Sequence, residues 1–135
     1  MNKKQNIFKE LKPFGEGASF HHAGLAVASI PPDLDKTFDP IQNVYVAFVS
    51  LNGFSLEFVE PADENSPVQQ FVKKGQKLYH LCYETDDIDE ALKVGRQSGF
   101  HCIAKPVPAT AFDGRRIAWV FSAVYGLIEL VEKEK

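Results

Sequence analysis

SLEFVE at residues 55–60 and LIELVE at residues 127–132 are the two stretches from which the architecture of this chain follows, because they match in character at nearly every position. Both are rich in apolar residues, as buried strands are, and both have a glutamate in the third place, Glu57 and Glu129. Such self-similarity between distant stretches is the mark of an internal repeat. We therefore expect two related halves.

A histidine lies upstream of each glutamate at a matching position. The strand-like runs FHHAGLAV at residues 20–27 and LYHLCYET at residues 78–85 have His22 and His80 in their third places. Each half thus offers one histidine and one glutamate. If the halves pack with pseudo-twofold symmetry, we expect the four side chains to surround a shared axis.

The two halves differ in length. The histidine and the glutamate are 35 residues apart in the first half and 49 apart in the second. The first half has three prolines and little periodicity at residues 29–43, whereas the second has a helix at residues 87–98, with Asp87 as its N-cap, and a further strand. We therefore expect the first half to be shortened at this point.

Turn and cap residues predict the other elements. Asn52-Gly53 indicates a tight hairpin within residues 44–60. Asn65-Ser66-Pro67 indicates the N-terminal cap of a helix that ends near Gly75. Three more strands are expected around residues 101–105, 115–121 and 125–132.

Length and composition indicate one α+β domain. The chain has 135 residues, of which 44% are hydrophobic and 24% charged. We expect the domain to span residues 20–135, with modules at about 20–75 and 76–135. Residues 1–19 are polar, contain Gly15 and Gly17, and are expected to form a lead-in segment.

Charge and hydropathy exclude several kinds of partner. A net charge of −3 gives no electrostatic reason to expect nucleic acid or an anionic membrane surface. No signal peptide is readable, and no stretch approaches the roughly 18–20 apolar residues of a membrane-spanning helix. Cys82 and Cys102 are expected to be buried free thiols. We expect a cytoplasmic protein that binds a small molecule.

The two histidines and two glutamates are candidate ligands of one divalent metal ion: His22, Glu57, His80 and Glu129. Such a set suits zinc, nickel, cobalt, manganese or iron better than calcium or magnesium, which prefer oxygen ligands. The ion could polarise a carbonyl oxygen and stabilise an enolate. Structural roles are the alternative, but burying Glu129 unpaired among its apolar neighbours would be costly. His21 is expected on the opposite strand face.

Five stretches together resemble the vicinal oxygen chelate superfamily of glyoxalases, bleomycin resistance proteins and dioxygenases, and its methylmalonyl-CoA epimerases more than glyoxalase I. They are HAGLAV at 22–27, SLEFVEPADENSP at 55–67, LYHLCYETDDIDEAL at 78–92, DGRRIAWVF at 113–121 and GLIELVE at 126–132. The resemblance covers residues 20–132. It implies two βαβββ modules that form a curved mixed sheet around a central metal site, commonly in a homodimer, here with the first module shortened.

The resemblance also implies roles for the four residues, which fall on the family's metal-ligand positions. The family's epimerases remove the proton α to a thioester with acidic residues, one of which is matched by Glu129. The position of the other base is taken by Val46 or a neighbour, and no acidic residue lies between residues 40 and 56. A single carboxylate, Glu57 or Glu129, could still move the proton alone, as resemblance to glyoxalase I would suggest.

We therefore expect a metal-dependent epimerase, isomerase or lyase that stabilises the enolate of a carbonyl or acyl-thioester substrate, with Glu129 and Glu57 as its catalytic carboxylates. Two alternatives stay open. One is a non-catalytic small-molecule-binding protein of the same fold, and the other is a metal-dependent dioxygenase. The shortened first module predicts a roomier pocket, suited to a larger or carrier-bound substrate.

Overall fold

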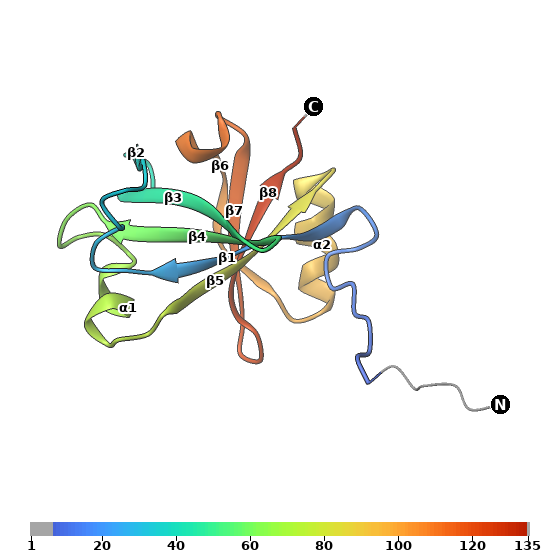
Figure 1. The fold of residues 1–135 in the computed structure, drawn as a ribbon. Helices are drawn as coiled ribbons and strands as arrows, with labels where there is room; N and C mark the ends of the chain where they lie inside the picture. The colour runs from blue at the N-terminus through green and yellow to red at the C-terminus, as the bar shows by residue number, and fades with distance from the viewer. Residues whose placement is uncertain (1–6, 135) are drawn as a thin grey trace.

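The computed structural model describes residues 7–134, in which eight strands form one curled mixed sheet in the order β2-β3-β4-β1-β5-β8-β7-β6 (Figure 1). The elements are β1 (Ala18–Ala26), β2 (Thr37–Asp39), β3 (Val44–Leu51), β4 (Phe54–Pro61), α1 (Gln69–Lys73), β5 (Leu78–Thr85), α2 (Ile88–Gln97), β6 (His101–Pro108), the 3₁₀ turn η1 (Thr110–Phe112), β7 (Arg116–Ser122) and β8 (Gly126–Glu132).

The sheet consists of two four-stranded halves that meet at the antiparallel pair β1–β5. In each half the first strand lies parallel to the last, β1 beside β4 and β5 beside β8. The remaining neighbours in each half are antiparallel. The predicted α+β fold of two repeated modules around a curved mixed sheet is therefore confirmed.

The first module is shortened where the sequence predicted it. Helix α2 connects β5 to β6, whereas no helix lies between β1 and β2, and β2 has only three residues. Pro31 and Pro32 lie in this connection and supply no backbone donor for a helix. The expected N-cap of α2 is present, since the Asp87 side chain accepts a hydrogen bond from the Glu90 N–H at 3.1 Å.

The predicted cap of α1 is wrong. The helix starts at Gln69, its N-cap is Val68, and no side chain caps it. The Ser66 carbonyl, rather than its hydroxyl, accepts the Gln69 N–H, at 3.1 Å, and this closes a separate turn before the helix. Val68 is fully buried, so apolar packing holds the start of α1 in place of a polar cap.

The sheet has a core on each face. On the concave face lie the residues that share the side of His80, including Val44, Val46, Val59, Cys82 and Val131. On the convex face of the second module, α2 covers a separate cluster that contains Val120, Ile128 and Leu130. The concave face is therefore the one that can enclose a site.

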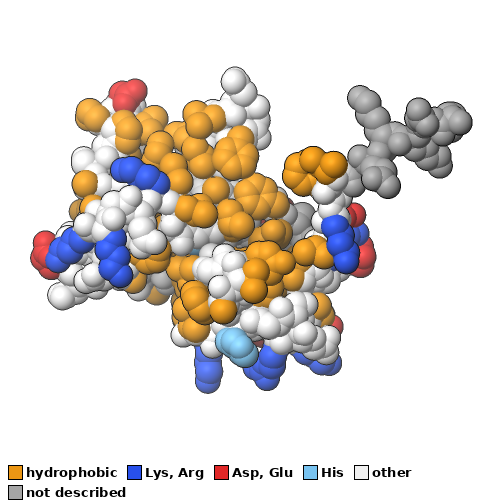
Figure 2. Space-filling model, turned by 90° about the horizontal axis from the view of Figure 1, so that it is seen from below, with side chains coloured by type: hydrophobic (Ala, Val, Ile, Leu, Met, Phe, Trp, Pro, Cys, Tyr) orange, Lys and Arg blue, Asp and Glu red, His pale blue; other side chains and the backbone are white. Residues whose placement is uncertain are grey.

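Within residues 7–134, no helix covers the convex side of the first module. Phe20 and Phe54 stack there, with ring centroids 6.2 Å apart, and are 45% and 50% exposed. Figure 2 shows hydrophobic side chains gathered over much of the face seen from below. The expected homodimer stays a prediction.

Phe14, within the expected lead-in segment, belongs to the convex core. Its side chain is 3% exposed, and its ring centroid lies 4.8 Å from that of Phe100. Gly95 of α2 leaves room for this ring, because a Cβ there would come within 2.9 Å of it. Phe14 is therefore part of the packed domain, and β1 starts at Ala18; a domain boundary at residue 20 stays a prediction.

Two further expectations concern solvent and membrane. Cys82 is buried as expected, but Cys102 is exposed, so its prediction as a buried thiol is wrong. Cys102 lies on β6, which is at one edge of the sheet and pairs with a single strand, β7. None of the helices within residues 7–134 is both long and apolar enough to cross a membrane.

Replacing Phe14 by alanine is expected to lower the free energy of unfolding by about 3–5 kcal/mol, because it leaves a cavity between α2 and the sheet. Urea denaturation measures the change. Ile7→Ala is the control, since Ile7 is 87% exposed and its loss should cost less than about 0.5 kcal/mol. Equal effects of the two variants would contradict the docking of Phe14.

Candidate metal centre

The four predicted ligands lie on four neighbouring strands and point to the concave face: His22 on β1, Glu57 on β4, His80 on β5 and Glu129 on β8. Their positions follow from the backbone pairing. Gly24 pairs with both Glu57 and His80, and this places them in one row across the sheet. Cys82 pairs with both His22 and Glu129, and this places those two residues in a second row. The pseudo-twofold repeat therefore brings the two pairs together.

The middle residue of each row is small. A Cβ atom on Gly24 would overlap the His80 ring, so only glycine allows this ring to lie flat over β1. Cys82 is the matching residue below His22. Sequence reasoning did not single out Gly24, although its place two residues after His22 matches that of Cys82 after His80.

The nitrogen and oxygen atoms of the cluster are separated as ligands of one ion would be. His80 Nε2 lies 3.2 Å from Glu57 Oε1 and 3.3 Å from Glu129 Oε1. His22 Nε2 lies 3.1 Å and 3.6 Å from the same two oxygens, and 3.3 Å from His80 Nε2. Two atoms bound to a zinc ion at about 2.1 Å are about 3.0–3.4 Å apart, for right and tetrahedral angles.

Burial leaves one oxygen of the cluster without a partner. All four residues are at most 4% exposed. An imidazole Nε2 carries one hydrogen at most, which cannot serve two carboxylates, and Glu129 Oε1 has no hydrogen bond within the described residues. Leaving a buried carboxylate oxygen unpaired is costly, and a cation between the side chains would remove that cost. These residues therefore fit a divalent metal ion.

Mutual contacts shift the pKa values of Glu57 and His80. Burial acts to raise the pKa of Glu57, but hydrogen bonds from His22 and His80 outweigh it and hold the pKa at about 2. Burial acts to lower the pKa of His80, but the Glu129 and Glu57 carboxylates, 3.3 and 3.2 Å from its Nε2, outweigh it and raise the pKa to about 9. A metal ion at this site would therefore have to displace a proton from His80.

Two aromatic rings complete the repeat, and sequence reasoning missed both. Phe48 on β3 lies edge-on to His22, with ring centroids 5.4 Å apart, and Trp119 on β7 lies edge-on to His80 at 4.9 Å. Phe48 pairs with Glu57 and Trp119 pairs with Glu129, so each ring extends one of the two rows. Both rings shield the histidines from water.

The cavity at the cluster is small, so the expected roomier pocket is wrong. It holds about 20 Å³, room for about one water molecule. Phe112 of η1 lies over His22, with ring centroids 6.1 Å apart. Trp119 and Gln42 also line this cavity, and Trp119 donates a hydrogen bond from Nε1 to Gln42 Oε1 at 3.2 Å. These contacts fill the space that the shortened first module was expected to leave open.

His21 lies beside His22, so its expected place on the opposite face is wrong. The β1–β5 register shifts between Phe20 and His22, and this bulge places the His21 ring beside that of His22. The two Nδ1 atoms are 2.8 Å apart. His21, His22 and Cys82 thus form a second group that could hold a metal ion. Burial, however, raises the pKa of the Cys82 thiol well above its usual value, which disfavours the thiolate.

Comparison with known proteins agrees with this geometry. The family model described as Glyoxalase/Bleomycin resistance protein/Dioxygenase superfamily matches residues 18–119. The mitochondrial methylmalonyl-CoA epimerase of Dictyostelium discoideum is 28% identical over 127 residues, with 79% of this chain and 76% of that protein covered.

Solved structures have the same curled sheet. A hypothetical protein from Bacillus halodurans C-125 has a TM-score of 0.71 and 26% identity, with 89% of this chain and 97% of that chain covered. Methylmalonyl-CoA epimerase from Mycobacterium tuberculosis has a TM-score of 0.70 and 23% identity, with 86% and 88% covered, a likeness that concerns the fold alone. From the family match and the sheet, the chain belongs to the glyoxalase/bleomycin resistance protein/dioxygenase superfamily.

Proposed function

We propose that this protein is a metal-dependent isomerase of the epimerase type, which removes and returns the hydrogen α to the carbonyl of an acyl thioester. The observation that carries the proposal is the convergence of two imidazoles and two carboxylates, with N–O distances of 3.1–3.6 Å, in a buried site. Membership of the superfamily and identity to a methylmalonyl-CoA epimerase support it.

The four side chains have two tasks in this proposal. All of them, His22, Glu57, His80 and Glu129, would hold one divalent ion. When bound, such an ion supplies a Lewis acid that stabilises negative charge on the substrate's carbonyl oxygen. The carboxylates have the second task, because they are the groups that can accept a proton from carbon.

Glu129 is the carboxylate that we assign as the base. Glu57 Oε1 lies 3.1 and 3.2 Å from the two imidazole Nε2 atoms, whereas Glu129 Oε1 lies farther from them, at 3.6 and 3.3 Å, and lacks a hydrogen bond within the described residues, so it is the freer of the two to accept a proton. The α C–H bond breaks, its electron pair moves toward the carbonyl oxygen, and the proton passes to Glu129. Glu57 is the alternative base.

Substrate entry requires the cup to open, because a cavity of about 20 Å³ cannot hold an acyl group. The η1 segment with Phe112 is the part of the wall that joins two strands rather than lying in the sheet. Its displacement would expose the cluster without breaking strand pairing. Phe48, Trp119 and the returning segment would then exclude water from the reacting carbon.

Protein purified without an affinity tag is expected to contain about one divalent metal ion per chain, measured by mass spectrometry of the metal content. His80→Ala and Glu129→Ala should lose the metal ion, because the three ligands that remain in each variant bind it more weakly than four do. His101→Ala, which removes an exposed imidazole on β6, should retain it. Retention of metal by Glu57→Ala would contradict a four-ligand site and favour the three-ligand dioxygenase arrangement.

The metal-loaded protein is expected to exchange the α-hydrogen of methylmalonyl-CoA with deuterium oxide at least about 100-fold faster than the metal-free protein, followed by proton NMR. Glu129→Gln should slow this exchange by about 10²–10⁴-fold, because the amide cannot accept the proton. Tight thioester binding without exchange would contradict the proposal and point to a non-catalytic binding protein.

A further inference from the structure

Asp39, on β2, is a buried carboxylate outside the proposed set of metal ligands. Its side chain is 2% exposed and lines the same small cavity as Glu57, His80 and Glu129. Within residues 7–134 its hydrogen bonds end on Oδ1, which accepts two backbone N–H groups of the following turn, at 3.0 and 3.2 Å. These bonds hold the carboxylate through Oδ1, in a residue that lines the cavity.

Asp39 lies on the opposite wall of the cup from the metal centre. β2 is the edge strand of the first module, and the curl of the sheet brings it against η1 of the second. Gln42, three residues after Asp39, accepts the hydrogen bond from Trp119, which itself lies on His80. Asp39 and Glu129 therefore reach the same cavity from different modules of the sheet.

Asp39 lies beside residues of β3 that line the same cavity. Val46 and Val44 line the same cavity, and Asp39 pairs with Val44 across the β2–β3 ladder. The stretch without acidic residues starts at residue 40, directly after Asp39. Asp39 is thus an acidic side chain beside the β3 residues that line the cavity.

We propose that Asp39 is the second proton carrier of the reaction proposed above, on which this inference rests. Glu129 takes the α-proton from one face of the carbon, and the electron pair of the broken C–H bond moves to the carbonyl oxygen. Protonated Asp39 then gives its proton to the other face, where the returning electron pair forms the new C–H bond. Glu129 ends protonated and Asp39 ionised, and exchange with water restores both.

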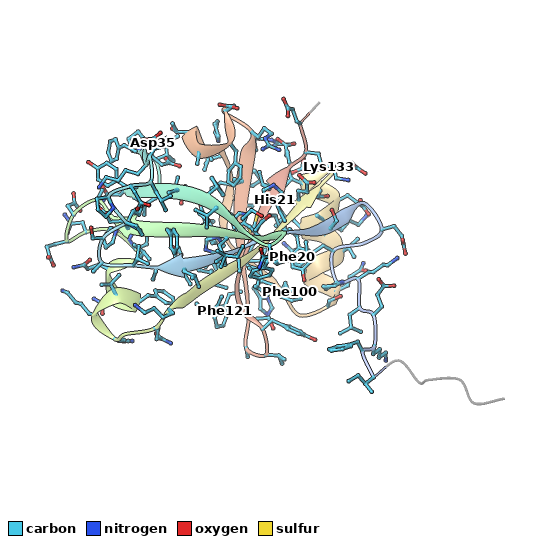
Figure 3. All side chains as sticks on the ribbon, viewed as in Figure 1. Phe20, His21, Asp35, Phe100, Phe121 and Lys133 are labelled. Atoms are coloured by element: carbon cyan, nitrogen blue, oxygen red, sulfur yellow. The ribbon has the colours of Figure 1, made fainter. Side chains whose placement is uncertain are left out.

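Asp39→Asn is the test, because the amide oxygen can still accept the two backbone N–H groups while the side chain can no longer carry a proton. Asp35→Asn is the matched control, an exposed aspartate in the connection before β2 (Figure 3). Each separate epimer of methylmalonyl-CoA is given to the metal-loaded proteins in deuterium oxide. Metal content and thermal unfolding are measured on the same samples.

The wild type and Asp35→Asn are expected to interconvert both epimers. Asp39→Asn should lose interconversion by at least about 100-fold while still exchanging the α-hydrogen of one epimer, the one whose hydrogen faces Glu129. A purely structural role would not leave exchange confined to one epimer.

Unchanged interconversion in Asp39→Asn would overturn the inference, as would equal loss of exchange from both epimers with metal content and stability intact. Either result would leave the proposed function standing, because the wild type would still exchange the α-hydrogen. Absence of exchange in the wild type itself would overturn the proposed function and, with it, the role of Asp39.

Discussion

Two carboxylates and two imidazoles are buried against one another, and the remaining features of the site depend on how their charges are balanced. Protonation of His80, whose pKa is raised, offsets one carboxylate only. A divalent cation with neutral imidazoles would offset both carboxylates, and the ligand atoms are already spaced for it. Metal binding is thus the arrangement in which burial of these groups is least costly.

The two modules of the sheet bring the four side chains together with two matching rows of residues. Each row across the sheet has a glutamate, a small residue, a histidine and an aromatic ring, and the small residues are Gly24 and Cys82. Phe48 and Trp119 hold the histidines edge-on from β3 and β7. Because the modules meet at one antiparallel strand pair, the two rows lie side by side and form one site rather than two.

The sequence predicted the features that depend on local pattern. Matching strands and the alternation of side chains were enough to place His22 and Glu129 on one face, and the prolines accounted for the shortened first module. The bulge that turns His21 toward His22 has no glycine or turn residue to announce it. Phe112 and Asp39 reach the site only because the sheet curls, and that long-range closure leaves no periodic signal in the chain.

X-ray absorption spectroscopy of the metal-loaded protein tests the central claim most directly, because it reports which atoms surround the ion. We predict nitrogen and oxygen neighbours alone, at about 2.0–2.2 Å for zinc, with imidazole scattering from two histidines. A sulfur neighbour at about 2.3 Å would contradict the account, since it would place the ion at the His21, His22 and Cys82 group instead of the two-histidine, two-glutamate centre.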